Sequence, residues 1–408
     1  MAGSTIDHIV ATVIFLAALL IFIGLFNQMI QTAVLYQRNR TIATKCSDLL
    51  DNMLLNPGYP LEYANDSITR PIEWGRLSRV PTIFGLQDPE FTEYRLSPFS
   101  LMRLYSSIGK EVYYSSTGQY YSNTTMGFGS FLLVSSANTL NDTTVATLLG
   151  INNTYGFQLV LTPLIQVSII ESCEGNPLSL NLTVTGNGIP LANALVSYML
   201  ITVENGEEAP LYIAHSNVSF TDNEGSCILS FQNVNASESY AFIAYAFLGG
   251  LVGVGHRQRI MAESYIIPLV ENISKRHVIL AHSYDICNAG ASFMSYNATF
   301  IVLNLDFSLF PMPFEDSVGE VVPSGYANLT IPTFKPGILA VAYQQSDNKT
   351  GVVLMPWGVS PLGFPVVFGS DPSDKTWVAT DIRHVLVGGV AYQAKLALWS
   401  LEGYGVMG

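Results

Sequence analysis

Few residues in this chain have the types and spacing that catalysis or metal binding requires. His277 and His282, with Asp285 and Cys287 close by, are the one cluster of metal-ligand residue types, and their spacing fits no standard metal site. The nucleophile-elbow, zinc-protease, phosphate-loop and dinucleotide-binding motifs are absent from the sequence. We therefore predict no enzyme activity, no cofactor and no bound metal.

Two stretches that suggest ligand binding have simpler explanations. Residues 249–255, GGLVGVG, lie in a stretch of β character with no helix after them, which favours a glycine-rich strand over a phosphate loop. The segment Asp222-Asn223-Glu224-Gly225 lacks the ligand spacing of a calcium loop. It predicts a turn in which Gly225 takes a positive φ.

Asparagine carries the strongest compositional signal. Of 25 Asn residues, 12 begin an Asn-x-Ser/Thr triplet without Pro in the middle, whereas chance gives roughly four. These sequons are at Asn39, Asn65, Asn123, Asn141, Asn152, Asn181, Asn217, Asn235, Asn272, Asn297, Asn328 and Asn348. Their even spread from Asn65 to Asn348 predicts a glycosylated surface outside the cell, with simple Asn/Ser/Thr bias as the alternative.

The four cysteines, Cys46, Cys173, Cys227 and Cys287, are too sparse for a disulfide scaffold. Cys173 precedes the first strand of an expected β-domain and Cys227 lies on a middle strand, so folding could bring these two together. Oxidation would then close a loop of about 54 residues and stabilise the fold by about 4 kcal/mol.

Charge excludes one class of partner. The net formal charge is -13, from 18 basic and 31 acidic residues spread thinly along the chain. This predicts no nucleic-acid surface and no polybasic lipid-binding patch.

The longest element that the sequence predicts is an amino-terminal helix. No formally charged side chain occurs between His8 and Gln37, and residues 9–26 are almost entirely apolar or small. A bilayer core requires roughly 20 such residues, so we expect a membrane helix. Apolar residues continue at helical spacing as far as Leu54, and Asn56-Pro57-Gly58 follows, which predicts one helix that ends at Leu55.

Two signals conflict over the orientation of this helix. Arg38, Arg40 and Lys45 follow the apolar span and no basic residue precedes it, which by the positive-inside rule places the carboxy-terminal side in the cytoplasm. The sequons and the β-rich composition favour the exterior. We expect the exterior, because the basic residues lie more than ten positions beyond Phe26 on a helix longer than the bilayer is thick.

Short motifs after the helix carry a family resemblance. The run SDLLDNMLLNPGYP, then IEWG at residues 72–75, FGLQD at 84–88 and YRLSPFSLMRL at 94–104 resemble archaeal type IV pilin-like surface proteins of the class III signal peptide type. The opening GSTIDHIV is similar to their amino termini, although only Met1-Ala2-Gly3 stand where a prepilin has a basic leader. The resemblance covers about residues 1–165 and implies a filament assembled through the helix.

Asp7 has two interpretations. A carboxylate in the first turn of a helix caps exposed amide groups and suits the positive end of the helix dipole. The pilin resemblance implies instead that Asp7 pairs with the amino terminus of a neighbouring subunit.

Downstream, residues 57–165 have the mixed pattern of a small α+β head: alternating runs with glycine turns, a short helix at TTVATLLGI, and a return to strand. Residues 166–270 contain at least six short alternating runs with turn residues every 8 to 12 positions, typical of a β-sandwich. The phrases GIPLANALVSY and TDNEGSCILSF resemble immunoglobulin-like domains of bacterial and archaeal surface proteins.

Residues 271–408 are again β-rich, and we expect a second sandwich-like domain there. Its last strand is HVLVGGVAYQAKLALWSL, expected as one long strand. The complete prediction is a mainly β protein: a hydrophobic helix at 1–56, a pilin-like α+β head at 57–165 and tandem immunoglobulin-like β-sandwich domains at 166–270 and 271–408.

The function that follows is a structural subunit of an extracellular, glycosylated archaeal pilus-like filament, a homopolymer assembled through its helix. Adhesion to a surface ligand is a further role that this function allows. The alternative is a single-pass, membrane-anchored adhesin or receptor stalk that does not polymerise. Either protein contacts the membrane and works at the cell surface with its carboxy-terminal domains outside.

Overall fold

We describe a computed structural model of the 408-residue chain. The described residues are 2–59, 73–77, 79–90, 92–104, 111–122, 132–171, 177–232, 234, 238–261, 263–287, 293–302, 307–312, 318 and 325–401.

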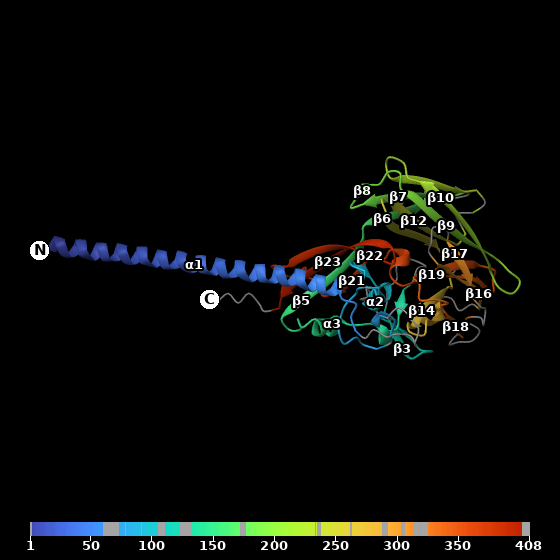
Figure 1. Ribbon diagram of the computed structural model, residues 1–408, viewed down its shortest axis with the longest axis horizontal. Coiled ribbons are helices and arrows are strands. Elements are labelled where there is room, and N and C mark those ends of the chain that lie inside the picture. Colours follow the sequence, from blue (N-terminus) through green and yellow to red (C-terminus); the bar gives the residue numbers. More distant parts are fainter. Residues whose placement is uncertain are drawn as a thin grey trace.

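One long helix projects from a β-rich head (Figure 1). The helix, α1, spans Ala2–Leu55, and its length at 1.5 Å per residue is about 80 Å. It ends at the predicted residue because Gly58 takes a φ of 75° and its amide donates to the Asn56 side chain at 2.8 Å. The predicted fold class, mainly β with a long amino-terminal apolar helix, is confirmed.

A five-stranded sheet supports the base of α1. Its strand order is β1-β22-β23-β5-β21. The bounds are β1 Arg95–Leu96, β22 Ala379–Val387, β23 Val390–Ser400, β5 Tyr155–Pro163 and β21 Val366–Gly369.

The sandwich sheet, formed by strands from residues 165–259, is the largest. It follows the order β10-β9-β12-β13-β6-β7-β11, with β8 paired to β7. The bounds are β6 Ile165–Glu171, β7 Leu178–Gly186, β8 Ile189–Pro190, β9 Leu195–Glu204, β10 Leu211–Phe220, β11 Ser226–Phe231, β12 Tyr240–Leu248 and β13 Leu251–Arg259. Leucines of β7 meet aromatic residues of β9 and β12 in a separate apolar core between its two halves.

Two four-stranded sheets and a hairpin make up the rest of the β structure. They are β18-β15-β14-β4, β17-β16-β19-β20 and β2-β3. Strand bounds are β2 Val112–Tyr114, β3 Gln119–Tyr121, β4 Leu133–Val134, β14 Ile266–Asn272, β15 His277–His282, β16 Met294–Val302, β17 Ser308–Pro311, β18 Ala327–Thr330, β19 Gly337–Gln345 and β20 Thr350–Trp357. The short helices are α2 Pro98–Arg103, α3 Asp142–Leu148, α4 Ser283–Cys287, η1 Trp74–Arg76, η2 Ser136–Asn138 and η3 Ser360–Leu362.

Strand pairing joins segments that we expected in separate domains. The expected boundaries place β5 and β23 in different domains, yet these two strands pair along their length. The boundary at 271 also divides β14, which pairs with β4 of the expected head. One apolar core contains residues of α1, of the expected head and of the carboxy-terminal segment. The regions 57–165 and 271–408 therefore share their sheets, whereas the sandwich sheet stays close to the expected limits of 166–270.

The last expected strand is two strands. Gly388 and Gly389 have φ of 56° and 93° and form a two-residue turn, so that Val387 pairs with Val390. This double positive φ suits the tight hairpins that match sheet twist. The predicted turn at Gly225, with a φ of 71°, is confirmed. Of the predicted glycine-rich strand at residues 249–255, the part from Leu251 lies on β13, whereas Gly249 and Gly250 form the turn before it.

Candidate functional site

The projecting part of α1, residues 7–37, is bare on every side. Each of its side chains is exposed, including Leu20 and Phe22 at 68%. It is long and apolar enough to cross a membrane. A helix that is apolar all round must be surrounded all round, by lipid or by other apolar helices.

Polar side chains interrupt this surface near its middle. Asn27, Gln28 and Gln31 are exposed on the projecting part. The hydroxyl of Thr32 donates back to the Gln28 carbonyl at 2.8 Å, which satisfies it within the helix. The amides of Asn27, Gln28 and Gln31 can form hydrogen bonds with polar groups of a neighbouring helix in an apolar environment.

The docked part of α1, residues 38–55, is buried on one side. Six apolar side chains on that side are at most 3% exposed, and they pack against β22, β23 and the segment that follows the helix: Ile42, Cys46, Leu49, Leu50, Met53 and Leu54. The Cys46 Sγ lies 3.5 Å from the Leu396 carbonyl oxygen, and burial raises the pKa of this thiol to about 11. The head therefore supplies the apolar partner for this half of the helix.

An ion pair fixes the docked part on the sheet. Arg383 on β22 donates to both carboxylate oxygens of Asp51, from Nε at 2.9 Å and from Nη2 at 3.1 Å. The same guanidinium donates to Ser47 Oγ at 3.1 Å and to Asp381 at 2.8 Å. The hydrogen bond to Asp51 is the main reason why the pKa of Arg383 is raised above its ordinary value. Where α1 leaves the head, Arg38 donates to Ser400 at 2.8 Å.

Motif residues that carried the family resemblance meet at the carboxy-terminal end of α1. The Trp74 indole donates to the Gly85 carbonyl at 2.7 Å, and a Cβ on Gly58 would lie 2.6 Å from the Trp74 ring. A Cβ on Gly85 would lie 2.0 Å from the Asn56 carbonyl oxygen. Both glycines are therefore required for the close approach that seals this end of the helix.

The Arg103 side chain joins several loops of the same region. It is 1% exposed and donates to the carbonyls of Trp74 at 2.8 Å, Leu77 at 2.7 Å and Asn138 at 2.6 Å. Desolvation lowers its pKa to about 10. The motif residue is thus a structural cross-link between loops.

Asp7 does not cap the helix. Because α1 begins at Ala2, its first turn contains no acidic residue, and Asp7 lies beyond it as an exposed side chain. The capping interpretation is therefore wrong. The assembly contact of Asp7 stays a prediction.

The sequons fall into three groups. Asn141, Asn152, Asn217, Asn328 and Asn348 are exposed, and Asn39, Asn181, Asn272 and Asn297 are half-buried. Asn65, Asn123 and Asn235 lie outside the described residues. The side-chain amide of Asn297 donates to the Pro210 carbonyl at 3.2 Å, so the nitrogen to which a glycan would be attached already has a hydrogen-bond partner within the fold.

The structure describes one cysteine of the expected Cys173–Cys227 disulfide. Cys227 is a buried free cysteine, and Cys173 lies outside the described residues.

The two histidines of the metal-like cluster do not lie together. His277 and His282 occupy the two ends of β15, and their odd separation places them on opposite faces of the strand. Among the described residues no group of three or more His, Cys, Asp or Glu side chains is placed to hold a metal ion.

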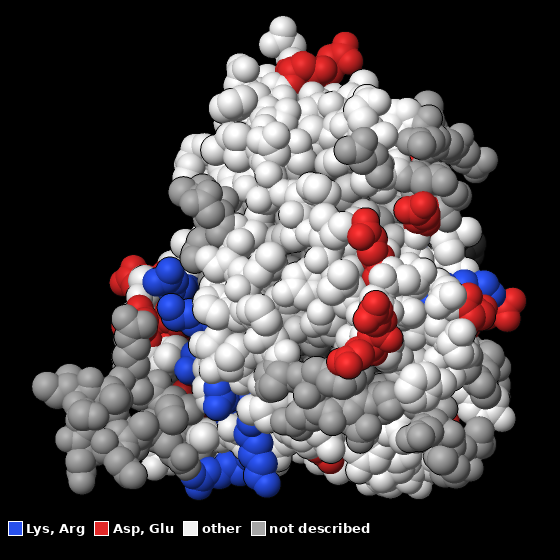
Figure 2. All heavy atoms as spheres, turned by 90° about the vertical axis from the view of Figure 1, so that its right-hand side faces the viewer, with Lys and Arg blue, Asp and Glu red and all other residues white. Residues whose placement is uncertain are grey.

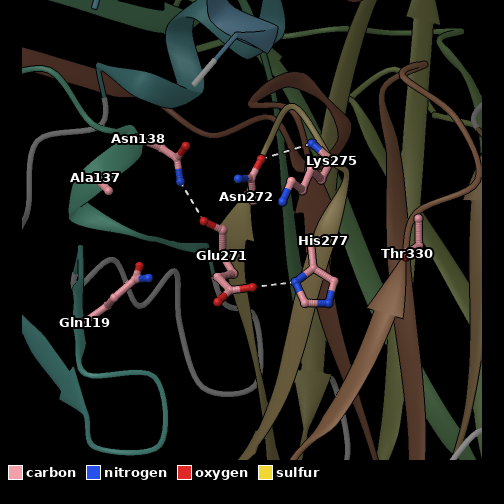
Figure 3. A pocket seen from close by; sticks show the side chains of 8 residues that line it. All are labelled: Gln119, Ala137, Asn138, Glu271, Asn272, Lys275, His277 and Thr330. Carbon is pink, nitrogen blue, oxygen red and sulfur yellow. Dashed lines mark hydrogen bonds and ion pairs between the residues drawn. The ribbon is translucent and has the colours of Figure 1, made fainter. Parts of the chain in front are cut away.

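His277 contributes instead to a polar hollow of about 510 Å³ (Figure 3). Its Nδ1 contacts the Glu271 carboxylate, and Asn138 donates to the Glu271 backbone carbonyl at 2.7 Å. The Asn272 side chain accepts from the Lys275 amide at 3.0 Å. These groups hold the turn between β14 and β15, and the hollow offers polar contacts rather than an activated nucleophile.

The end of the head remote from α1 has little charge. Figure 2 shows this end: most of the visible surface is uncharged, acidic side chains are scattered over it, and basic side chains gather along one lower edge. The thin spread of charge expected from composition therefore holds on this face.

Comparison with known proteins gives no family. No family model matches the chain, and no curated protein matches it. Among solved structures, it is similar at 9% identity and a TM-score of 0.21 to trypsin-activated alpha-2-macroglobulin from Escherichia coli, over 54% of this chain and 18% of that one. A bacterial ice-binding adhesin is 11% identical with a TM-score of 0.15, over 54% of this chain and 69% of that one. Similarities this weak carry no argument about fold or function.

Sequence reasoning missed the residues that fix α1 to the head. Arg383 and Asp51 are 332 positions apart, and no local pattern links them. The spacing of Ile42, Cys46, Leu50 and Met53 on one face was the available signal, since the polar residues Thr44, Asp48 and Asn52 lie on the other.

Proposed function

We propose that this protein is a subunit of an extracellular filament that assembles through α1, with the heads on the outside. The observation that carries the proposal is that α1 keeps at least one exposed face from Asp7 to Leu55. The projecting part is exposed on every side, and the docked part is exposed on the face opposite the head, at Thr41, Ala43, Thr44, Asp48 and Asn52. Copies of α1 can therefore approach one another without displacing a head.

The length of the exposed apolar stretch of α1 supports packing against other copies of α1 as well as against lipid. The exposed apolar stretch from Ile9 to Tyr36 is about 42 Å long, whereas the hydrocarbon core of a bilayer is about 30 Å thick. Met29, Val34 and Leu35 stand beyond such a core if the span begins at Ile9, and they are 70%, 58% and 44% exposed. Burying each of them against neighbouring helices contributes about 1 to 3 kcal/mol.

The second candidate is a membrane-anchored surface protein that stays monomeric. The observation in its favour is that about 42 Å also matches a bilayer with its headgroups, about 40 to 45 Å. The head would then rest on the membrane surface, with Tyr36 and Arg38 at the lipid headgroups.

A charge placed in the region beyond the core separates the two candidates. In a filament, Val34→Asp buries a carboxylate among apolar helices, so we expect filaments on native cells to fall at least tenfold while the amount of membrane-bound chain is unchanged. Thr380→Asp adds the same charge at an exposed position of β22 and should leave both unchanged. Filaments at parental abundance in Val34→Asp, or none in the parent, would contradict polymerisation.

A further inference from the structure

Strand β10 is a long open edge of the sandwich sheet. It pairs with β9 through ten consecutive residues, from Leu211 opposite Glu204 to Phe220 opposite Leu195. On its other side, no strand pairs with it within the part of the chain that the structure describes. Such an edge presents unpaired backbone groups to any other strand.

The usual protections are missing from this edge. The sequence of β10, LYIAHSNVSF, contains no Lys, Arg, Asp, Glu or Pro, and its register with β9 has no bulge. Three apolar side chains are widely exposed: Leu211 at 56%, Val218 at 55% and Phe220 at 63%. The edge strands β1, β18 and β21 are by contrast only two to four residues long.

A sequon lies on this strand. Asn217-Val218-Ser219 places an exposed asparagine opposite Tyr198 of β9. Asn217 also lines a hollow of about 520 Å³ whose walls come from β9, β10 and the end of β11. In Figure 1, β10 lies on the side of the head away from the projecting part of α1.

The walls of this hollow suit a sugar. The partly exposed ring of Phe231, packed on the buried Tyr198, stands beside the polar side chains of His215, Ser230 and Gln232. Aromatic faces can pack against the apolar face of a pyranose ring, and the polar groups can meet its hydroxyls. A sugar linked to Asn217 therefore has a mixed surface immediately next to its point of attachment.

We propose that Asn217 carries an N-linked saccharide that occupies this hollow and covers the β10 edge, so that heads cannot pair edge to edge. The inference rests on the exterior location in the proposed function. It assigns to the sequon on this ten-residue edge a protective role, because a bulky hydrophilic group on β10 replaces the charges and prolines with which edge strands generally prevent pairing.

The first test is glycopeptide mass spectrometry on the full chain from its native cells. We expect the peptide that contains β10 to carry a saccharide on Asn217 in most molecules. A bare Asn217 beside occupied sequons elsewhere overturns this inference and leaves the exterior location intact. Bare asparagines at every sequon overturn the exterior location itself.

The second test measures association of the detergent-solubilised full chain by light scattering. Asn217→Gln and Ser219→Ala both remove the sequon, whereas Ser219→Thr keeps it and Asn348→Gln removes a sequon from a turn. We expect the first two variants to at least double in mass, and the last two to match the parent. Enzymatic removal of glycans from the folded parent gives the same comparison without a mutation.

A rescue variant identifies the surface responsible. Adding Val218→Lys to Asn217→Gln restores a charge to the edge, and we expect the parental mass to return. Unchanged mass in Asn217→Gln and in the deglycosylated parent, or association that Val218→Lys fails to reverse, overturns the proposal.

Discussion

The two halves of α1 have similar apolar residues and entirely different surroundings. Leu50 in the docked part is fully buried, and Leu35 in the projecting part is 44% exposed. The difference lies in the polar residues between them. The docked part carries Thr44, Asp48 and Asn52 along one side, so it needs an apolar partner on the other side only.

The projecting part has no such polar side, because no formally charged residue occurs from His8 to Gln37. A single head cannot surround it, and only lipid or several other helices can. The distribution of polar residues, more than the amount of apolar surface, therefore determines what kind of partner each half of α1 requires.

The largest expected effect contrasts one truncation in each half. Leu50→Ala should lower the free energy of unfolding of the head by about 2 to 5 kcal/mol, because it leaves a cavity between α1 and the sheet. Leu35→Ala, the matched control, should change it by less than about 0.5 kcal/mol. Denaturant unfolding of the full chain in detergent measures both, and equal losses would show that the two halves are not distinct.

Alkaline pH should weaken the packing of the docked part through Cys46. Burial raises the pKa of the Cys46 thiol from near 9 to about 11, so the neutral thiol stabilises the fold fully below pH 9. That contribution, on the order of 2 kcal/mol, is lost as the pH rises from 9 to 11. Buried tyrosines titrate in the same direction, so the measurement is the difference between the parent and Cys46→Ala across this range. Parallel pH profiles would refute the assignment to Cys46.

The smallest effect is expected at the ion pair. Arg383→Met should cost about 1 kcal/mol, since Arg383 and Asp51 remain 25% and 38% exposed and water screens the pair. A double-mutant cycle with Asp51→Asn isolates the coupling, which we expect to be about 0.5 to 1 kcal/mol. A coupling of zero would leave the apolar contacts as the whole basis of docking.

Local patterns predicted the features that local chemistry controls. The end of α1 at Leu55 follows from Asn56-Pro57-Gly58, and the Gly225 turn and the sandwich strands follow from turn residues and alternation. The hairpin at Gly388-Gly389 was missed although the glycine pair was visible, because the flanking residues continue one alternating pattern.

Long-range pairing could not be read from the sequence. Gln158 pairs with Ala397, and nothing near either residue specifies the other. The expected domain boundary at 165 therefore divided strands that share a sheet.

Shearing of native cells tests the central claim most directly. Material released by shear is pelleted, imaged by electron microscopy and probed for the full-length chain. We predict filaments that contain this chain, with the α1 helices packed along the filament axis and the heads outside. A chain that stays in the membrane fraction as single heads, with no filaments in the sheared pellet, would contradict it.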